Sequence, residues 1–223
     1  MERHFERDLE ELKERLLWMG SLAQRAAHQS VHAVLEADDK LARAVLDEER
    51  IINELQIEID ERVVQLLALQ QLMATDLRFV VAIARINYDL ERLGDLAVNI
   101  AQSAQRIMRH PRVKPYVDLP RMSDLAEKMV HDSIDSLARR DVELARSVLS
   151  RDDQVDNLRD QIYRELLSYM MGDSSVVFAA FELIQVAQNL ERIADHATNI
   201  AEDVIFMVVG NDVRHPALDR NAS

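Results

Sequence analysis

The sequence predicts an all-α protein built from two tandem antiparallel three-helix bundles. The chain has 223 residues but only 4 Gly and 4 Pro, which leaves little material for the tight turns of a sheet protein. Apolar residues recur at three- and four-residue spacing, and the pattern repeats about 100 residues later. Because 48% of the residues are hydrophobic, each half can bury a core of its own.

Three helices are expected in the first half of the chain. Residues 5–35 form the first, and residues 40–72 form the second after a break at 36–39. Their apolar stripes comprise Leu9, Leu12, Leu16, Met19, Ala23 and Ala26 on the first helix, and Leu46, Ile52, Leu55, Ile59, Val63 and Leu66 on the second. The third helix starts near Asp76 and runs to Met108, before a proline-containing linker. Residues 1–110 are therefore predicted to form the first bundle.

The second half repeats the first and should hold three more helices. Residues 90–95 (LERLGD) reappear at 190–195 (LERIAD), and residues 41–46 (LARAVL) reappear at 144–149 (LARSVL). The offset changes from 100 to 103 residues, so the second copy lacks three residues between its second and third helices. Arg139 and Arg140 suit the end of one helix, and Asp141 suits the start of the next. Residues 118–210 are expected to form the second bundle, followed by a flexible tail at 211–223.

Each copy carries polar oxygen ligands at four-residue spacing on its third helix. These ladders are Glu91, Asp95 and Asn99 in the first copy, and Glu191, Asp195 and Asn199 in the second. Matching pairs lie on the flank of the preceding helix, namely Glu49 and Asn53 in the first copy and Asp152 and Asp156 in the second. Like charges four residues apart cost a helix roughly 0.2–0.5 kcal/mol per pair, and a bound divalent cation would relieve that repulsion. Such oxygen ligands suit magnesium, manganese and iron.

Spacing alone leaves a second interpretation of these ladders open. The second ladder falls on the polar face of its helix, away from Leu190, and a solvated helix surface presents the same kind of side chains. If the ladders do bind metal, the site lies at the surface and is not enclosed.

Several single residues are further candidates. His28 and His32 are four residues apart and could bind a metal, or one of them could accept a phosphoryl group, although both also suit a helix surface or a helix contact. His196 flanks the second ladder where the first copy has Leu96, so the two sites cannot be identical. Trp18 lies off the apolar stripe and suits an interface or partial burial.

The composition excludes several classes of protein. There is no Cys, no Gly-rich phosphate loop, no nucleophile elbow and no Glu-x-x-His pair, so nothing points to an enzyme. We expect a cytoplasmic protein without direct membrane insertion, because the N-terminus does not read as a secretion signal and no apolar run reaches the ~18 residues of a membrane span. The net charge of −13 argues against nucleic acid as a partner.

The two ladder segments resemble the signature repeats of the PhoU family. They are residues 88–101 (YDLERLGDLAVNIA) and 190–202 (LERIADHATNIAE), and residues 74–78 (ATDLR) and 165–170 (ELLSYM) also look like family segments. The resemblance implies two three-helix bundles, a homodimer, and iron or zinc clusters bound at the bundle surface by E(D)xxxD motifs. The motif fits the ladders Glu91–Asp95 and Glu191–Asp195 and the pair Asp152–Asp156. Glu49–Asn53 departs from it, because Asn53 offers one neutral oxygen in place of a carboxylate.

The resemblance also implies a function. It is that of a non-enzymatic cytoplasmic regulator that links the ATPase subunit of a phosphate ABC transporter to a sensor histidine kinase and represses the phosphate regulon. The ligand types do not decide whether the cation is iron, zinc, manganese or magnesium. The alternative is a helical scaffold or metal-buffering protein with no link to a kinase.

Overall fold

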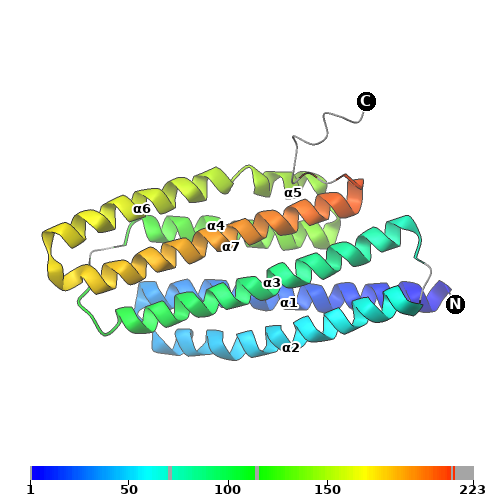
Figure 1. Cartoon of the computed structure of the whole chain (residues 1–223), viewed down its shortest axis with the longest axis horizontal. Coiled ribbons are helices and arrows are strands. Elements are labelled where there is room, and N and C mark those ends of the chain that lie inside the picture. Colours follow the sequence, from blue (N-terminus) through cyan, green and yellow to red (C-terminus); the bar gives the residue numbers. More distant parts are fainter. Residues whose placement is uncertain (1, 70–71, 114–115, 212, 214–223) are drawn as a thin grey trace.

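The first three helices form an antiparallel bundle. The computed structural model describes residues 2–69, 72–113, 116–211 and 213, and their regular structure is entirely helical. Helices α1 (Glu2–Glu36), α2 (Asp39–Leu69) and α3 (Ala74–Ile107) each pack against the other two. They make up the lower layer in Figure 1.

The second bundle consists of α4 (Asp118–Arg139), α5 (Val142–Leu149), α6 (Asp152–Gly172), the short 3-10 helix η1 (Ser174–Val176) and α7 (Val177–Val209). One residue separates α6 from η1, whereas four separate α2 from α3, so the predicted three-residue deletion falls at this connection. The predicted tail at 211–223 lies almost wholly outside the described residues. No helix in the described ranges is both long enough and apolar enough to cross a membrane.

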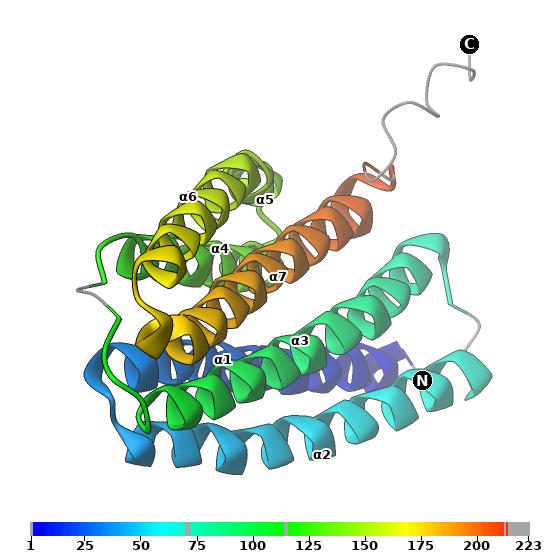
Figure 2. The same ribbon diagram turned by 60° about the vertical axis from the view of Figure 1, so that its left-hand side comes forward.

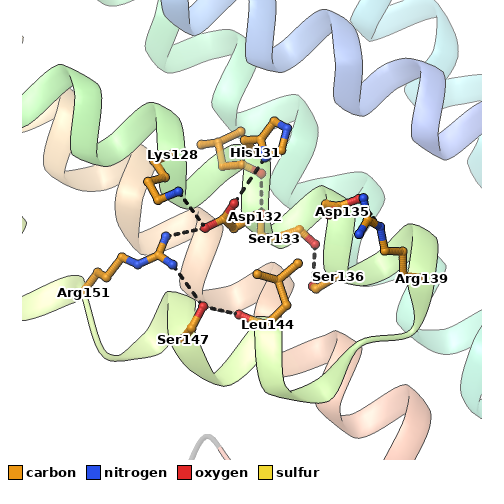
Figure 3. Close-up of polar contacts among 11 residues, drawn as sticks. Lys128, His131, Asp132, Ser133, Asp135, Ser136, Arg139, Leu144, Ser147 and Arg151 are labelled. Carbon is orange, nitrogen blue, oxygen red and sulfur yellow. Dashed lines mark hydrogen bonds and ion pairs between the residues drawn. The ribbon is translucent and has the colours of Figure 1, made fainter.

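The interruption between α5 and α6 differs from the single helix expected there. Figure 3 shows the contacts of Arg151, which lies between the two helices: it donates from Nη1 to Asp132 Oδ2 on α4 at 2.5 Å and from Nη2 to the Ser147 hydroxyl at 3.0 Å. Burial opposes ionisation of Asp132, but hydrogen bonds from Arg151 and His131 hold the pKa of its carboxyl below the usual value. The side chain of Arg151 thus connects the interruption between α5 and α6 to α4.

The predicted apolar stripes lie in or against the core, with one exception. Leu46 was assigned to the stripe of α2 but is 36% exposed. The buried row on this helix repeats every seven residues, at Val45, Ile52, Ile59 and Leu66. Leu46 lies one residue beyond Val45, which turns its side chain about 100° away from the core.

The two copies share the way in which their first helix ends. Ala37 and Arg140 follow α1 and α4, and both have φ of 55°, in the left-handed region, although neither is Gly. In each case the next amide donates to a carbonyl five residues back. Asp141 then accepts from the Leu144 amide at 3.0 Å and caps α5, which confirms the helix start predicted there.

Helices α3 and α7 form the seam between the bundles. They lie side by side and run antiparallel in Figures 1 and 2. Arg106 Nε lies 2.8 Å from Glu182 Oε1, and Arg85 Nη1 lies 3.1 Å from Asp203 Oδ1, so ion pairs tie the two helices together on either side of their centre. Both carboxylates are buried. Since the ladders also follow α3 and α7, this seam sets where the ladders lie.

Candidate functional site

Four carboxylates of the second bundle come together where α6 packs against α7. Asp152 and Asp156 lie in the first two turns of α6, and Glu191 and Asp195 lie in the middle of α7. Burial, followed by repulsion from Asp156, Asp153 and Glu191, raises the pKa of Asp152. The four predicted side chains therefore act on one another, and we call them the second-bundle cluster.

Asp195 has the most perturbed carboxyl of this cluster. Partial burial of the group, and then repulsion from Glu191, Asp152 and Asp156, raises its pKa to about 6, although the residue as a whole is exposed. At neutral pH the group is still mostly ionised. The second-bundle cluster thus concentrates negative charge at the surface of the molecule.

Among the described side chains, one arginine pairs with this cluster, and it was not among the predicted site residues. Arg159 Nη1 donates to Glu191 Oε1 at 2.5 Å and lies 3.0 Å from Asp156 Oδ1. Its position three residues after Asp156 places it on the same flank of α6, so helical spacing could have identified it. One cation opposite four carboxylates leaves the cluster with a net negative charge.

The corresponding site of the first bundle is less acidic. Asn53 donates from Nδ2 to Glu49 Oε1 at 2.5 Å, and Arg92 donates from Nη1 to Asp95 Oδ2 at 2.9 Å. Burial and repulsion from Asp95 and Glu49 raise the pKa of Glu91, against the opposing charge of Arg92. Glu49, Glu91 and Asp95 form the first-bundle cluster, with an amide in place of a fourth carboxylate.

The asparagine that ends the second ladder contacts the other bundle. Asn199 donates from Nδ2 to Asp89 Oδ1 on α3 at 3.3 Å, and His196 Nδ1 lies 2.7 Å from the same oxygen. Asn99, its counterpart, is exposed on α3, as Asn199 is on α7. His196 was expected only to flank the ladder, and the structure shows that it joins α7 to α3.

Asp89 is a residue of this seam that the ladder pattern did not reveal. Its residue exposure is only 6%, and its counterpart Asn189 is also buried. Asp89 lies three residues after Ile86 and next to Leu90, both in the core, so helical spacing already places it beside the core. A carboxylate at such a position needs a hydrogen-bond partner, and His196 provides one.

The chemistry of the donors fits a cation, better in the second bundle than in the first. In the part of the chain that the structure describes, no group of three or more His, Asp or Glu side chains is arranged to hold an ion. Mutual repulsion in the second-bundle cluster nonetheless favours a positive charge there. To bind an ion, Glu191 and Asp156 would have to exchange Arg159 for it.

Known proteins share both the sequence and the fold of this chain. The PhoU domain family model matches it twice, over residues 16–104 and 119–204. The phosphate-specific transport system accessory protein PhoU homolog of Pseudomonas putida is 39% identical over 217 residues, 97% of this chain and 85% of that protein. The crystal structure of PhoU from Pseudomonas aeruginosa matches with a TM-score of 0.89 at 38% identity, over 93% of this chain and 100% of that one.

A more distant structure shares the same architecture. It is that of the phosphate transport system regulatory protein PhoU from Streptococcus pneumoniae, with a TM-score of 0.84 at 27% identity, over 94% of this chain and 99% of that one. The two matches to the domain family fall on the two bundles, and each spans one carboxylate ladder. The chain therefore belongs to the PhoU family.

Proposed function

We propose that this chain is a non-enzymatic, cytoplasmic regulator of phosphate uptake. It represses the phosphate regulon by linking the ATPase subunit of a phosphate ABC transporter to a sensor histidine kinase. The observation that carries the proposal is near full-length similarity to relatives named as accessory and regulatory proteins of phosphate transport. Helical bundles with long exposed faces suit a protein that acts through contacts.

Metal binding by the carboxylate clusters is the second part of the proposal. Asp152, Asp156, Glu191 and Asp195 bind iron or zinc, with manganese and magnesium as alternatives. The support is electrostatic: burial, and then repulsion from Glu191, Asp152 and Asp156, raises the pKa of Asp195 to about 6, and a bound cation would offset that repulsion. The first-bundle cluster binds more weakly, because Asn53 replaces a carboxylate.

Gene expression tests the regulatory part. Deleting the gene should raise transcription of phosphate-starvation genes in phosphate-rich medium, and a plasmid copy should restore repression. Unchanged transcription in the deletion strain would count against repression. Affinity capture with the purified chain at high and low phosphate should recover the transporter ATPase and a kinase, and capture of neither would favour the scaffold alternative.

Thermal melts test the metal part separately. A cation at ~100 times its dissociation constant adds about 2.7 kcal/mol, which corresponds to roughly 5–10 °C for a chain of this size. Asp195→Asn should remove much of that rise and Asp95→Asn less, because its own cluster is less acidic. A rise that both substitutions leave intact would exclude these residues as ligands.

Self-association as a homodimer is the third part. Trp18 on α1 is 47% exposed, with the Arg15 guanidinium 5.8 Å from its ring centroid, and an exposed Trp suits a buried contact between copies. Trp18→Ala should lower the sedimentation coefficient of the purified protein. An unchanged coefficient would remove this face from the proposed interface.

A further inference from the structure

Two histidines on α1 form a pair away from both carboxylate clusters. The ring centroids of His28 and His32 are 4.2 Å apart. Their side chains are 52% and 37% exposed. Residues four apart lie one above the other on a helix, so both imidazoles reach the same surface patch, beside α4.

Each imidazole is held by a carboxylate at Nδ1. Glu127 on α4 places Oε2 2.8 Å from His28 Nδ1, and Glu36 on α1 places Oε1 2.8 Å from His32 Nδ1. An ionised carboxylate only accepts hydrogen bonds, so in both neutral rings Nδ1 carries the hydrogen and Nε2 carries the lone pair. The other oxygen of Glu127 accepts from the Ser123 hydroxyl at 2.8 Å, which fixes this carboxylate.

This arrangement prepares both rings to bind a metal ion. Ligating histidines in proteins commonly donate their second nitrogen to a carboxylate, which sets the tautomer and the ring orientation. Two histidines four residues apart on a helix also have the spacing of the H-E-x-x-H zinc motif. Zn–N bonds are about 2.0–2.1 Å long, so two nitrogens on one ion lie within about 4 Å of each other. Rings whose centroids are 4.2 Å apart can meet that requirement.

The ligand type selects the class of ion. Imidazole nitrogen suits zinc, copper and nickel, whereas magnesium and calcium prefer oxygen. The net charge of −13 attracts cations to the surface. Among the described side chains, no group of three or more His, Asp or Glu could hold an ion, so the protein supplies two ligands here and water supplies the rest.

We infer that His28 and His32 form a two-imidazole binding site for Zn²⁺, Cu²⁺ or Ni²⁺ beside the α1–α4 contact. Both Nε2 atoms bind the ion, and Glu127 and Glu36 orient the rings. The site uses no residue of the carboxylate clusters and does not depend on the proposed function. If the contact of His28 with Glu127 only joins α1 to α4, the pair has no affinity for an ion.

Calorimetric titration of the untagged full-length chain with Ni²⁺ tests the site. An Asp195→Asn background weakens the second-bundle cluster, so that its signal does not obscure the titration. His28→Gln and His32→Gln should each lower Ni²⁺ affinity by about 100-fold, because two-point attachment is lost. Glu127→Gln should lower it by about tenfold, because the ring of His28 loses its orientation.

His131 provides the matched control. Its side chain is 59% exposed and its Nδ1 lies 3.2 Å from Asp132 Oδ1, but it has no histidine three or four residues away. His131→Gln should leave Ni²⁺ affinity unchanged. The electron paramagnetic resonance spectrum of bound Cu²⁺ should show two nitrogen ligands in the parent and fewer in His28→Gln. Affinity within about threefold of the parent in either His28→Gln or His32→Gln, with helical circular dichroism retained, would overturn the inference.

Discussion

Replacing Asp195 by Asn should stabilise the metal-free protein at neutral pH. Burial, and then repulsion from Glu191, Asp152 and Asp156, raises the pKa of Asp195 from 3.8 to about 6. At about 1.4 kcal/mol for each pKa unit this corresponds to about 3 kcal/mol, and solvent screening of an exposed residue reduces it to about 1 kcal/mol. Asn keeps the shape of the side chain without the charge, so the free energy of unfolding should rise by that amount.

The gain in the free energy of unfolding of Asp195→Asn should also depend on pH, and it should shrink as the pH falls. Because the pKa of Asp195 is higher in the folded chain than in the unfolded one, the folded state binds this proton more tightly. The cost of its charge is therefore fully present above about pH 6 and disappears as the pH falls toward 3.8. At pH 4.5 only part of this cost remains, so the gain should be smaller there than at pH 7.5.

Urea unfolding followed by circular dichroism, with a chelator present, measures both values. Asp124→Asn is the control, because Asp124 is exposed on α4 and is not among the carboxylates that act on Asp195. It should change stability by less than about 0.5 kcal/mol at either pH. A loss of stability in Asp195→Asn at pH 7.5, or an equal gain at both pH values, would contradict this electrostatic account.

Three further substitutions test the fold by their unfolding free energies. Ala37→Gly should add roughly 0.5–1 kcal/mol, because Gly adopts the left-handed conformation at φ of 55° without strain. Arg106→Met should cost about 2 kcal/mol, because it leaves the buried carboxylate of Glu182 without its cation. Gly20→Leu should cost about 1–3 kcal/mol, because even a Cβ at Gly20 would lie 3.2 Å from Ile134 Cδ1 on α4.

Each of these substitutions has a matched control. Ala44→Gly, inside α2, should cost about 1 kcal/mol, since no left-handed strain is relieved there. Arg43→Met breaks an exposed pair with Asp39 and should cost less than about 0.5 kcal/mol. A Cβ added at Gly172 meets no atom within 4 Å, so Gly172→Leu should be tolerated. Equal effects of a substitution and its control would contradict the stated cause.

The sequence predicts the helices and the duplication because their signals are local. The polar segment after Glu36 ends α1, and the prolines after His110 follow the end of α3. The ladders repeat after 100 residues, whereas the helix before them repeats after 103. The difference of three residues places the shortened connection between these two helices, where the structure has it, before η1. Carboxylates on adjacent flanks of α6 and α7 then meet, because those helices are neighbours in a three-helix unit.

Long-range partners could not be predicted in the same way. Arg151, at the interruption between α5 and α6, pairs with Asp132 on another helix. His196 pairs with Asp89, which is 107 residues away in the chain. Helical spacing shows which residues share a face, but not which part of the other bundle that face meets. The exposure of Leu46 has a different cause, since counting three- and four-residue steps does not fix the centre of a stripe to within one residue.

His196 contacts the seam between the two bundles, where its Nδ1 lies 2.7 Å from Asp89 Oδ1. Burial is the main cause of the raised pKa of Glu91 in the first bundle and of Asp195 in the second, and a positive charge on His196 would oppose both shifts. The first copy has Leu96 at the equivalent position and provides no such group. Because α3 and α7 are antiparallel neighbours, one protonated histidine on α7 could act on a carboxylate of each bundle. The two copies therefore differ here in kind, because His196 pairs with Asp89 on the other bundle and a leucine at the same position could neither donate to that carboxylate nor carry a charge.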